Sequence, residues 1–320
     1  MKHHLICLTL DTDPDGLSGK ETNRRALAWQ GLTEAQQLPQ DLRELSSSLG
    51  CPIPLTWFVR ADGQLRDLLG TSLYLLEKFE AFWKGVHDLG HEIGWHPHLY
   101  AHSRSCVEPV LVTDPSEACA ELERLWDDLL SSSFAPTAFR NGEGWHCAQT
   151  LRTVEKFSLI CDSTAIPGRS GGNDHPMNWL GTPNQPYFPD SRDIRISGAE
   201  RPLLEMPMNT WLVQAPYETE PRIRYMNPAI HESLFADALD RWEATLNDRD
   251  AGLYVWVLIF HPDEIMSVGR KDLLYAHSRA ALCRNIMKFA ARVRQAGHTL
   301  DFATLSDAAR RWRSHGTLDS

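Results

Sequence analysis

The sequence lacks the features that mark a membrane protein, a secreted protein or a disulfide scaffold. It contains no apolar run of about 18 residues or more, so no membrane-spanning helix is expected. The first apolar run, Leu5–Leu10, is too short for a signal peptide and ends at Asp11, which favours a strand. The seven cysteines are scattered and form no Cys-x-x-Cys pair, which is typical of reduced thiols in a cytoplasmic protein.

Basic charge is also scarce. The chain has 32 Lys and Arg residues against 42 Asp and Glu residues, and its formal net charge is −10. Such a surface repels nucleic acid and anionic membranes, so neither is an expected partner, although a local basic pocket is not excluded. A small molecule or a sugar is the expected substrate, and a homo-oligomer stays open.

Short β-rich runs alternate with helical patterns along the whole chain, without repeats or linkers. The alternation predicts an α/β fold of parallel strands joined by helical crossovers, namely a single-domain, distorted (β/α) barrel of about seven strands over residues 1–320. In such barrels the chemistry lies at the carboxyl ends of the strands. The expected strands are 4–10, 54–60, 137–140, 158–162, 203–206, 253–260 and 298–302, and the expected helices are 40–49, 73–86, 117–130, 150–156, one from 227, 273–296 and one from 306.

Residues 163–195 interrupt this alternation. They are rich in Gly, Pro, Asn and Asp, which predicts a long ordered loop. Loops of that length in compact domains often act as lids or as substrate walls.

Two aspartates follow the first apolar strand. Asp11 and Asp13 are two residues apart, and on an extended chain such side chains point to the same side. Two close carboxylates repel each other unless a cation or an arginine lies between them. A divalent metal would bind one carboxylate and leave the other free as a base. An acidic turn is the alternative interpretation.

Four of the 14 histidines lie in one short segment, as His91, His96, His98 and His102. Neutral imidazole is a common nitrogen ligand for zinc and related ions. His96 and His98 share a side of an extended segment, whereas His98 and His102 are one helical turn apart. A surface histidine run is the alternative interpretation.

A set of short motifs resembles the polysaccharide deacetylase (NodB-homology, carbohydrate esterase 4-like) family. Each motif alone is weak, but the set follows the order of the family and extends from residue 5 to residue 305. The motifs are LTLDTD at 8–13, LTWFV at 55–59, GHEIGWH at 90–96, FRNGEGW at 139–145, CDST at 161–164, LEMPM at 204–208 and FHPDE at 260–264.

The resemblance implies a role for each matching residue. Asp11 would be the general base, and Asp13 and His96 would ligate the metal. Arg140 would pair with Asp11 as a buried bidentate arginine. His261 would be the general acid that protonates the leaving group.

The chain departs from the family at one ligand position. The family usually places its second histidine ligand four residues after the first, and that position is Tyr100 here. His98 fits a His-x-His variant of some relatives, and Pro97 favours an extended conformation that turns His98 toward the side of His96. His98 is therefore the preferred third ligand, and His102 is its competitor.

The residues and the resemblance together imply a metal-dependent hydrolase. It would remove an acyl group, with acetyl as the favoured one, from an N- or O-acylated sugar or a related small substrate. Zinc is the expected divalent metal. Trp95, Tyr100 and Trp145 are the expected substrate contacts, because aromatic faces pack against sugar rings. Two alternatives remain: a hydrolase of cyclic amides, imides or other non-peptide C–N bonds on the same barrel, and a non-catalytic ligand-binding barrel, which Tyr100 suggests.

Overall fold

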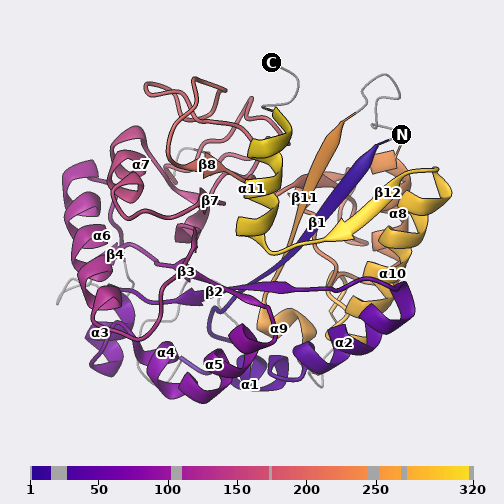
Figure 1. Ribbon diagram of the computed structural model, residues 1–320, viewed down its shortest axis with the longest axis horizontal. Helices are drawn as coiled ribbons and strands as arrows, with labels where there is room; N and C mark the ends of the chain where they lie inside the picture. Colours follow the sequence, from indigo (N-terminus) through magenta and orange to yellow (C-terminus); the bar gives the residue numbers. More distant parts are fainter. Residues whose placement is uncertain are drawn as a thin grey trace.

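The computed structural model describes residues 2–15, 27–101, 110–172, 175–243, 252–267 and 272–316, so the competitor ligand His102 lies outside the described residues. Within them, parallel strands form a central sheet and helices line its periphery (Figure 1). None of the helices in these ranges combines the length and the apolar character that crossing a lipid bilayer requires.

Strand β1 (His3–Asp11) is the centre of the sheet, and nearly all of it is buried. Strand β11 (Leu253–Phe260) pairs with one side of β1 from His3 to Leu10. On the other side, β12 (Thr299–Phe302) pairs with the first half of β1, and β2 (Leu55–Arg60) pairs with the second half. The two longest strands, β1 and β11, therefore lie side by side, and most of their residues are buried in the core.

From β2 the sheet continues through four further strands, β3 (Glu92–His96), β6 (Ala138–Phe139), β7 (Cys161–Asp162) and β8 (Leu204–Glu205). Every pairing in this sheet is parallel. Seven strands lie in continuous order, and β12 beside β1 is the eighth. The predicted distorted (β/α) barrel is confirmed. The distortion has a local cause, because β6, β7 and β8 are each only 2 residues long.

The seam between β8 and β11 is closed by side chains instead of a strand ladder. Gln185 accepts from the Val255 N–H at 2.9 Å and donates to the Val255 carbonyl at 3.1 Å. Asn209 accepts from the Val257 N–H at 2.6 Å. An open sheet edge leaves backbone donors and acceptors unpaired, and these two amide side chains pair them.

The helices and small hairpins surround this sheet (Figure 1). A 3-10 turn, η1 (Gly142–Gly144), follows β6. Two hairpins pair antiparallel, β4 (Tyr100–Ala101) with β5 (Val110–Leu111), and β9 (Thr210–Val213) with β10 (Arg222–Tyr225). The helices are α1 (Gln30–Ala35), α2 (Leu38–Leu49), α3 (Gly63–Leu69), α4 (Tyr74–Lys78), α5 (Glu80–Asp88), α6 (Pro115–Leu130), α7 (Ala148–Glu155), α8 (Glu232–Glu243), α9 (Pro262–Ile265), α10 (Arg279–Gln295) and α11 (Leu305–Gly316).

Two predicted helix starts are wrong. No helix begins at Asn227, because its side chain closes a turn by accepting from the Ala229 N–H at 2.7 Å, and α8 begins only at Glu232. The helix predicted from residue 273 begins at Arg279, after a turn that Asp272 closes by accepting from two backbone N–H groups. The pattern predicted over 73–86 is two helices, α4 and α5, that meet at Phe79.

The long loop predicted at 163–195 is borne out by its described residues, 163–172 and 175–195. They contain isolated bridges, such as Ser170 with Asn178, but no helix and no extended strand. The loop leaves the carboxyl end of β7 and leads to the amino end of β8, and its Trp179 donates to the Gly144 carbonyl of η1 at 2.6 Å.

Candidate active site

Four of the predicted site residues lie at the ends of four different strands. Asp11 ends β1 and His96 ends β3, while Arg140 follows β6 and His261 follows β11. Because parallel strands end at the same edge of a sheet, the fold brings these side chains together. Interatomic distances between 2.6 and 3.8 Å link Asp11 to Arg140 and to His96.

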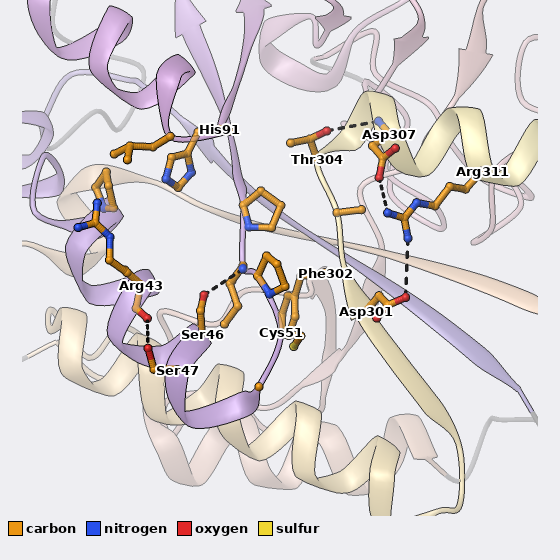
Figure 2. Close-up of a pocket in the computed structure, with 18 residues that line it drawn as sticks. Arg43, Ser46, Ser47, Cys51, His91, Asp301, Phe302, Thr304, Asp307 and Arg311 are labelled. Carbon is orange, nitrogen blue, oxygen red and sulfur yellow. Dashed lines mark hydrogen bonds and ion pairs between the residues drawn. The ribbon is translucent and has the colours of Figure 1, made fainter.

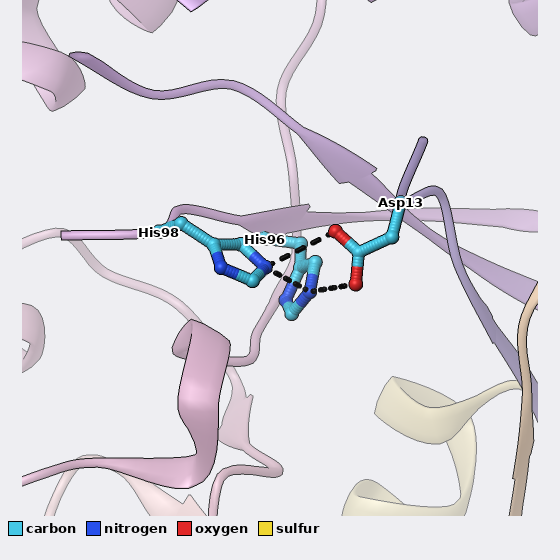
Figure 3. A group of neighbouring side chains, drawn as sticks. All are labelled: Asp13, His96 and His98. Atoms are coloured by element: carbon cyan, nitrogen blue, oxygen red, sulfur yellow. Dashed lines mark hydrogen bonds and ion pairs between the residues drawn. The ribbon is translucent and has the colours of Figure 1, made fainter. Parts of the chain in front are cut away.

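Asp13, His96 and His98 form a compact cluster (Figure 3). His98 Nε2 lies 3.1 Å from Asp13 Oδ1 and 3.2 Å from His96 Nε2. His96 Nε2 lies 3.8 Å from Asp13 Oδ2. One ligand atom from each of the three residues lies within 4.8 Å of the others, so the cluster could hold a metal ion.

The hydrogen bonding of the cluster fits a divalent cation. His96 Nδ1 lies 2.8 Å from the Arg140 carbonyl oxygen. A carbonyl oxygen only accepts, so Nδ1 carries a proton, and the Nε2 lone pair of the neutral ring points at Asp13 and His98. Two imidazole nitrogens and a carboxylate oxygen are a donor set typical of zinc and similar ions. The residues therefore fit a metal.

The charges of the cluster favour a cation at the same place. Burial alone would raise the pKa of the Asp13 carboxyl, but His98 and His96 bring that pKa well below its usual range. Burial alone would lower the pKa of His98, but Asp13 raises it to about 9. Each group thus stabilises the charged form of its neighbour, and the Asp13 carboxylate is the negative group of the cluster to which a cation would bind.

The His98 ring is positioned by the turn η1. A Cβ atom at Gly142 would lie 2.5 Å from the His98 ring, so only glycine leaves the ring its place. The next residue, Glu143, has a left-handed backbone with φ of 59°. Its carboxylate lies 3.6 Å from His98 Nδ1 and accepts a hydrogen bond from the Tyr100 hydroxyl. The adjacent His98 imidazole lowers the pKa of Glu143 to about 2.

Arg140 is fully buried and holds one oxygen of Asp11. Its Nη1 lies 2.6 Å from Asp11 Oδ1 and 3.0 Å from Thr9 Oγ1. Its Nε and Nη2 donate to the carbonyl and hydroxyl oxygens of Ser163. The predicted bidentate geometry of the Arg140–Asp11 pair is therefore wrong, because Nε and Nη2 of Arg140 donate to Ser163 and only Nη1 donates to Asp11. Asp11 Oδ2 faces the cluster, 3.8 Å from His96 Nε2.

His261 also lies beside Asp13, with its Nε2 3.8 Å from Asp13 Oδ2. Glu264 accepts from the His261 backbone N–H at 2.9 Å and lies 3.2 Å from its Nδ1. Burial alone would lower the pKa of His261, but Glu264 raises it to about 10. Glu264 therefore favours the protonated form of the ring, whose Nε2 faces Asp13.

Sequence reasoning missed two charged residues of the site, Glu143 and Arg60. Glu143 had a signal, because an acidic residue stands between two glycines directly after the arginine motif. Arg60 ends β2, and its Nη1 lies 3.5 Å from Asp13 Oδ1, while its Nε lies 2.5 Å from Asp62. Its only sequence signal was its place at the end of a predicted strand.

Two of the three predicted aromatic contacts are wrong. The Trp95 ring is 1% exposed, donates to the Ala61 carbonyl at 2.9 Å and packs against Trp126, because alternation along β3 turns it away from the side of His96. Trp145 is 4% exposed, belongs to the core and does not line the site. Tyr100 remains beside the site, with its ring centroid 5.4 Å from that of His98.

A small cavity of about 140 Å³ opens over the cluster, lined by Asp11, Asp13, His96, His98, Arg140, Asn141, Glu143, Gly144, Met208 and Tyr225. A larger cavity of about 870 Å³ lies at the opposite end of the barrel, beside the amino ends of β2 and β3 (Figure 2). Its charged groups include Arg311, which pairs with Asp307 at 2.8 Å. Five of the predicted site residues thus line the smaller cavity, namely Asp11, Asp13, His96, His98 and Arg140, whereas His261 does not.

No protein-family model matches the sequence, and no curated protein sequence matches it. Solved structures match over nearly the whole chain. A candidate glycoside hydrolase/deacetylase from Parabacteroides distasonis matches with a TM-score of 0.56 and 13% identity, covering 98% of this chain and 71% of that protein. A candidate polysaccharide deacetylase from Mycobacterium smegmatis has a TM-score of 0.49 and 16% identity, with coverages of 98% and 92%.

A family 4 carbohydrate esterase from Streptomyces lividans, solved with acetate, matches with a TM-score of 0.38 and 12% identity, covering 92% of this chain and 91% of that protein. At such identities the likeness concerns the fold. The match to the Parabacteroides distasonis structure shows that this chain shares its fold. The resemblance of the motifs and the likeness of the fold thus agree.

Proposed function

We propose that this chain is a metal-dependent hydrolase that removes an acyl group from an N- or O-acylated sugar or a related small substrate. Acetyl is the acyl group that we favour. One observation carries the proposal: a cluster fit for a metal, Asp13 with His96 and His98, lies beside a separate carboxylate that a buried arginine holds. His261 completes the arrangement beside Asp13.

Asp13, His96 and His98 would hold the metal. When bound there, a divalent ion supplies Lewis-acid chemistry, because it acidifies water and polarises an acyl oxygen. The Arg140 carbonyl accepts from His96 Nδ1 and would orient that ring, and the Glu143 carboxylate lies 3.6 Å from His98 Nδ1. Zinc is the metal that we propose for this ligand set.

Asp11 would act as the general base. Arg140 fixes its Oδ1, so Oδ2 is free to take a proton from the attacking water. The water oxygen then bonds to the acyl carbon. Arg140 keeps the carboxylate oriented and compensates its charge in a buried place.

His261 would act as the general acid. Glu264 holds its Nδ1 side, which leaves Nε2 to donate a proton to the departing nitrogen or oxygen. The bond between the acyl carbon and that atom breaks, and a carboxylate and a free amine or alcohol leave. Tyr100 would border the substrate.

The non-catalytic alternative rested on the tyrosine at position 100. His98 lies 3.1 Å from Asp13, close enough to act as the third ligand that Tyr100 does not supply, and this supports the catalytic proposal. We also propose one domain over residues 1–320, a cytoplasmic location and no nucleic-acid partner. A homo-oligomer remains an open alternative.

Metal analysis and acetate release test the proposal together. We expect about one divalent ion per purified chain and acetate release from N-acetylated amino sugars. Asp13→Ala should lose both, whereas the control His87→Ala should keep both, because its side chain is 75% exposed on α5. A wild-type protein without metal, or an Asp13→Ala variant with full occupancy, would contradict the assignment.

A further inference from the structure

A second cavity, of about 390 Å³, adjoins the candidate active site on the side of His261. Tyr225 lines both this cavity and the small cavity over the cluster. Asn227, another lining residue, donates to Glu264 Oε2 at 2.7 Å, and Glu264 is the carboxylate that holds His261. Because Tyr225 borders both cavities, a leaving group that receives its proton from His261 could extend past Tyr225 into the second cavity.

The wall of this second cavity is basic. It includes Arg169, Arg222 and Arg224 and no acidic residue. One carboxylate, that of Glu218, forms ion pairs with two of these guanidinium groups, at 3.0 Å from Arg222 and 2.6 Å from Arg224. Three positive groups thus face one negative group, in a chain whose net charge is −10.

Arg169 is the residue on which the inference depends most. Its guanidinium lies 5.0 Å from the centre of the Tyr225 ring and makes no ion pair within the described part of the chain. Arg222 is 73% exposed at its side chain, so water and salt screen it, whereas Arg169 is half-buried. A guanidinium fixed over an aromatic ring still presents its N–H donors to a ligand.

We propose that this basic cavity, formed around Arg169 and Tyr225, binds an anionic group on the leaving-group part of the substrate. A carboxylate or a phosphate matches the forked donors of arginine. The inference rests on the proposed function for the identity of the reacting bond, and it narrows the substrate to an acylated amine or alcohol that carries negative charge. Such binding weakens as salt is added.

Calorimetry with three related amines tests the basic cavity. The probes are glucosamine, glucosamine 6-phosphate and muramic acid, which carry no acid group, a phosphate and a carboxylate. We expect metal-loaded wild-type protein to bind at least one acidic probe about tenfold tighter than glucosamine. The acidic probe that binds more tightly shows whether the basic cavity prefers a phosphate or a carboxylate.

Variants of Arg169 test whether this residue causes the preference for the acidic probe. Arg169→Gln should remove most of the preference for the acidic probe, and Arg169→Glu should remove all of it. Arg43→Glu is the matched control, because it makes the same charge change beside the large cavity at the opposite end of the barrel. The control should keep the preference.

Three outcomes would overturn the inference: equal binding of all probes by the wild type, a preference that survives in both Arg169 variants, or a preference lost equally in Arg43→Glu. If the metal alone caused the preference for the acidic probe, that preference would survive in both Arg169 variants, which is the second outcome. Product binding needs no turnover, so absent acetate release with an intact, Arg169-dependent preference would refute the proposed function and leave the basic cavity in place.

Discussion

Asp11 and Asp13 lie two residues apart and have different neighbours. Arg140 occupies one oxygen of Asp11, whereas Asp13 faces His98 and His96. The roles that we propose for them should therefore separate by mutation. Asp11→Asn should keep the metal and the fold but lower turnover by roughly two or more orders of magnitude, because an amide cannot take the proton.

Steady-state kinetics and metal analysis of the same preparation measure both effects. Loss of the metal from Asp11→Asn with a normal rate per bound ion would mean that the two aspartates have the opposite roles.

The histidine ligands give a second prediction. His98→Ala should cost much more metal affinity than His102→Ala, because His98 Nε2 lies 3.1 Å from Asp13, and a ligand set of one carboxylate and one imidazole binds weakly. Metal titration of both variants, each checked for folding by circular dichroism, decides between them. Equal and near wild-type affinities would leave the site without a third protein ligand and would favour the non-catalytic barrel.

The sequence located the polar site residues better than the aromatic ones, and the reason is physical. Asp11, His96 and His261 follow strands, and parallel strands bring their ends together. Trp95 is adjacent to His96, and side chains alternate along a strand, so an inward His96 already implied an outward Trp95. Glu143 depends on a left-handed turn and on a ring from another segment, and local patterns do not reveal such pairs.

Among the elements, the turn η1 gives a prediction in which no residue of the metal cluster itself is changed. Gly142→Ala should displace the His98 ring, since the new Cβ would lie 2.5 Å from it, and should weaken metal binding by about tenfold or more. Gly85→Ala in α5 is the control, because its Cβ would meet no atom within 4 Å. Metal titration compares them. Unchanged affinity in Gly142→Ala would show that the His98 ring moves freely or does not bind the metal.

Element boundaries depended on side chains that sequence patterns do not place. Asn227-Pro228 has the order of a helix start, yet Asn227 closes a turn and binds Glu264 from another element. The seam closed by Gln185 and Asn209 joins residues about 50 to 70 positions apart in the chain, which strand periodicity cannot predict. The strands themselves were predictable because their apolar runs are buried.

For the whole molecule, two buried histidines predict acid sensitivity. His4 Nδ1 accepts from Trp256 Nε1 at 2.8 Å, and His91 Nδ1 accepts from the Leu55 N–H at 2.9 Å. Burial lowers the pKa of each to about 4, from 6.5 in the unfolded chain. Between these values the unfolded state binds more protons, so the free energy of unfolding falls as the pH falls from about 6.5 to about 4.

Each of these two histidines should contribute a loss of about 2 kcal/mol between pH 7 and pH 5. Denaturant unfolding at the two pH values measures it. His91→Gln, whose amide oxygen can still accept the Leu55 N–H, should show a smaller loss than the wild type, and the exposed control His87→Gln should not. An equal loss in all three proteins would mean that His91 titrates normally in the folded state.

The seam between β8 and β11 divides the molecule into parts that tolerate sequence change differently. Asp11 and His261 stand at the ends of β1 and β11, which a continuous backbone ladder joins from His3 to Leu10, so their spacing does not depend on any one side chain. Arg169 and Tyr225 lie beyond the seam, on a loop and on β10. The wall that we propose selects the substrate can therefore change while the spacing of Asp11 and His261, the two groups that we propose transfer protons, stays the same.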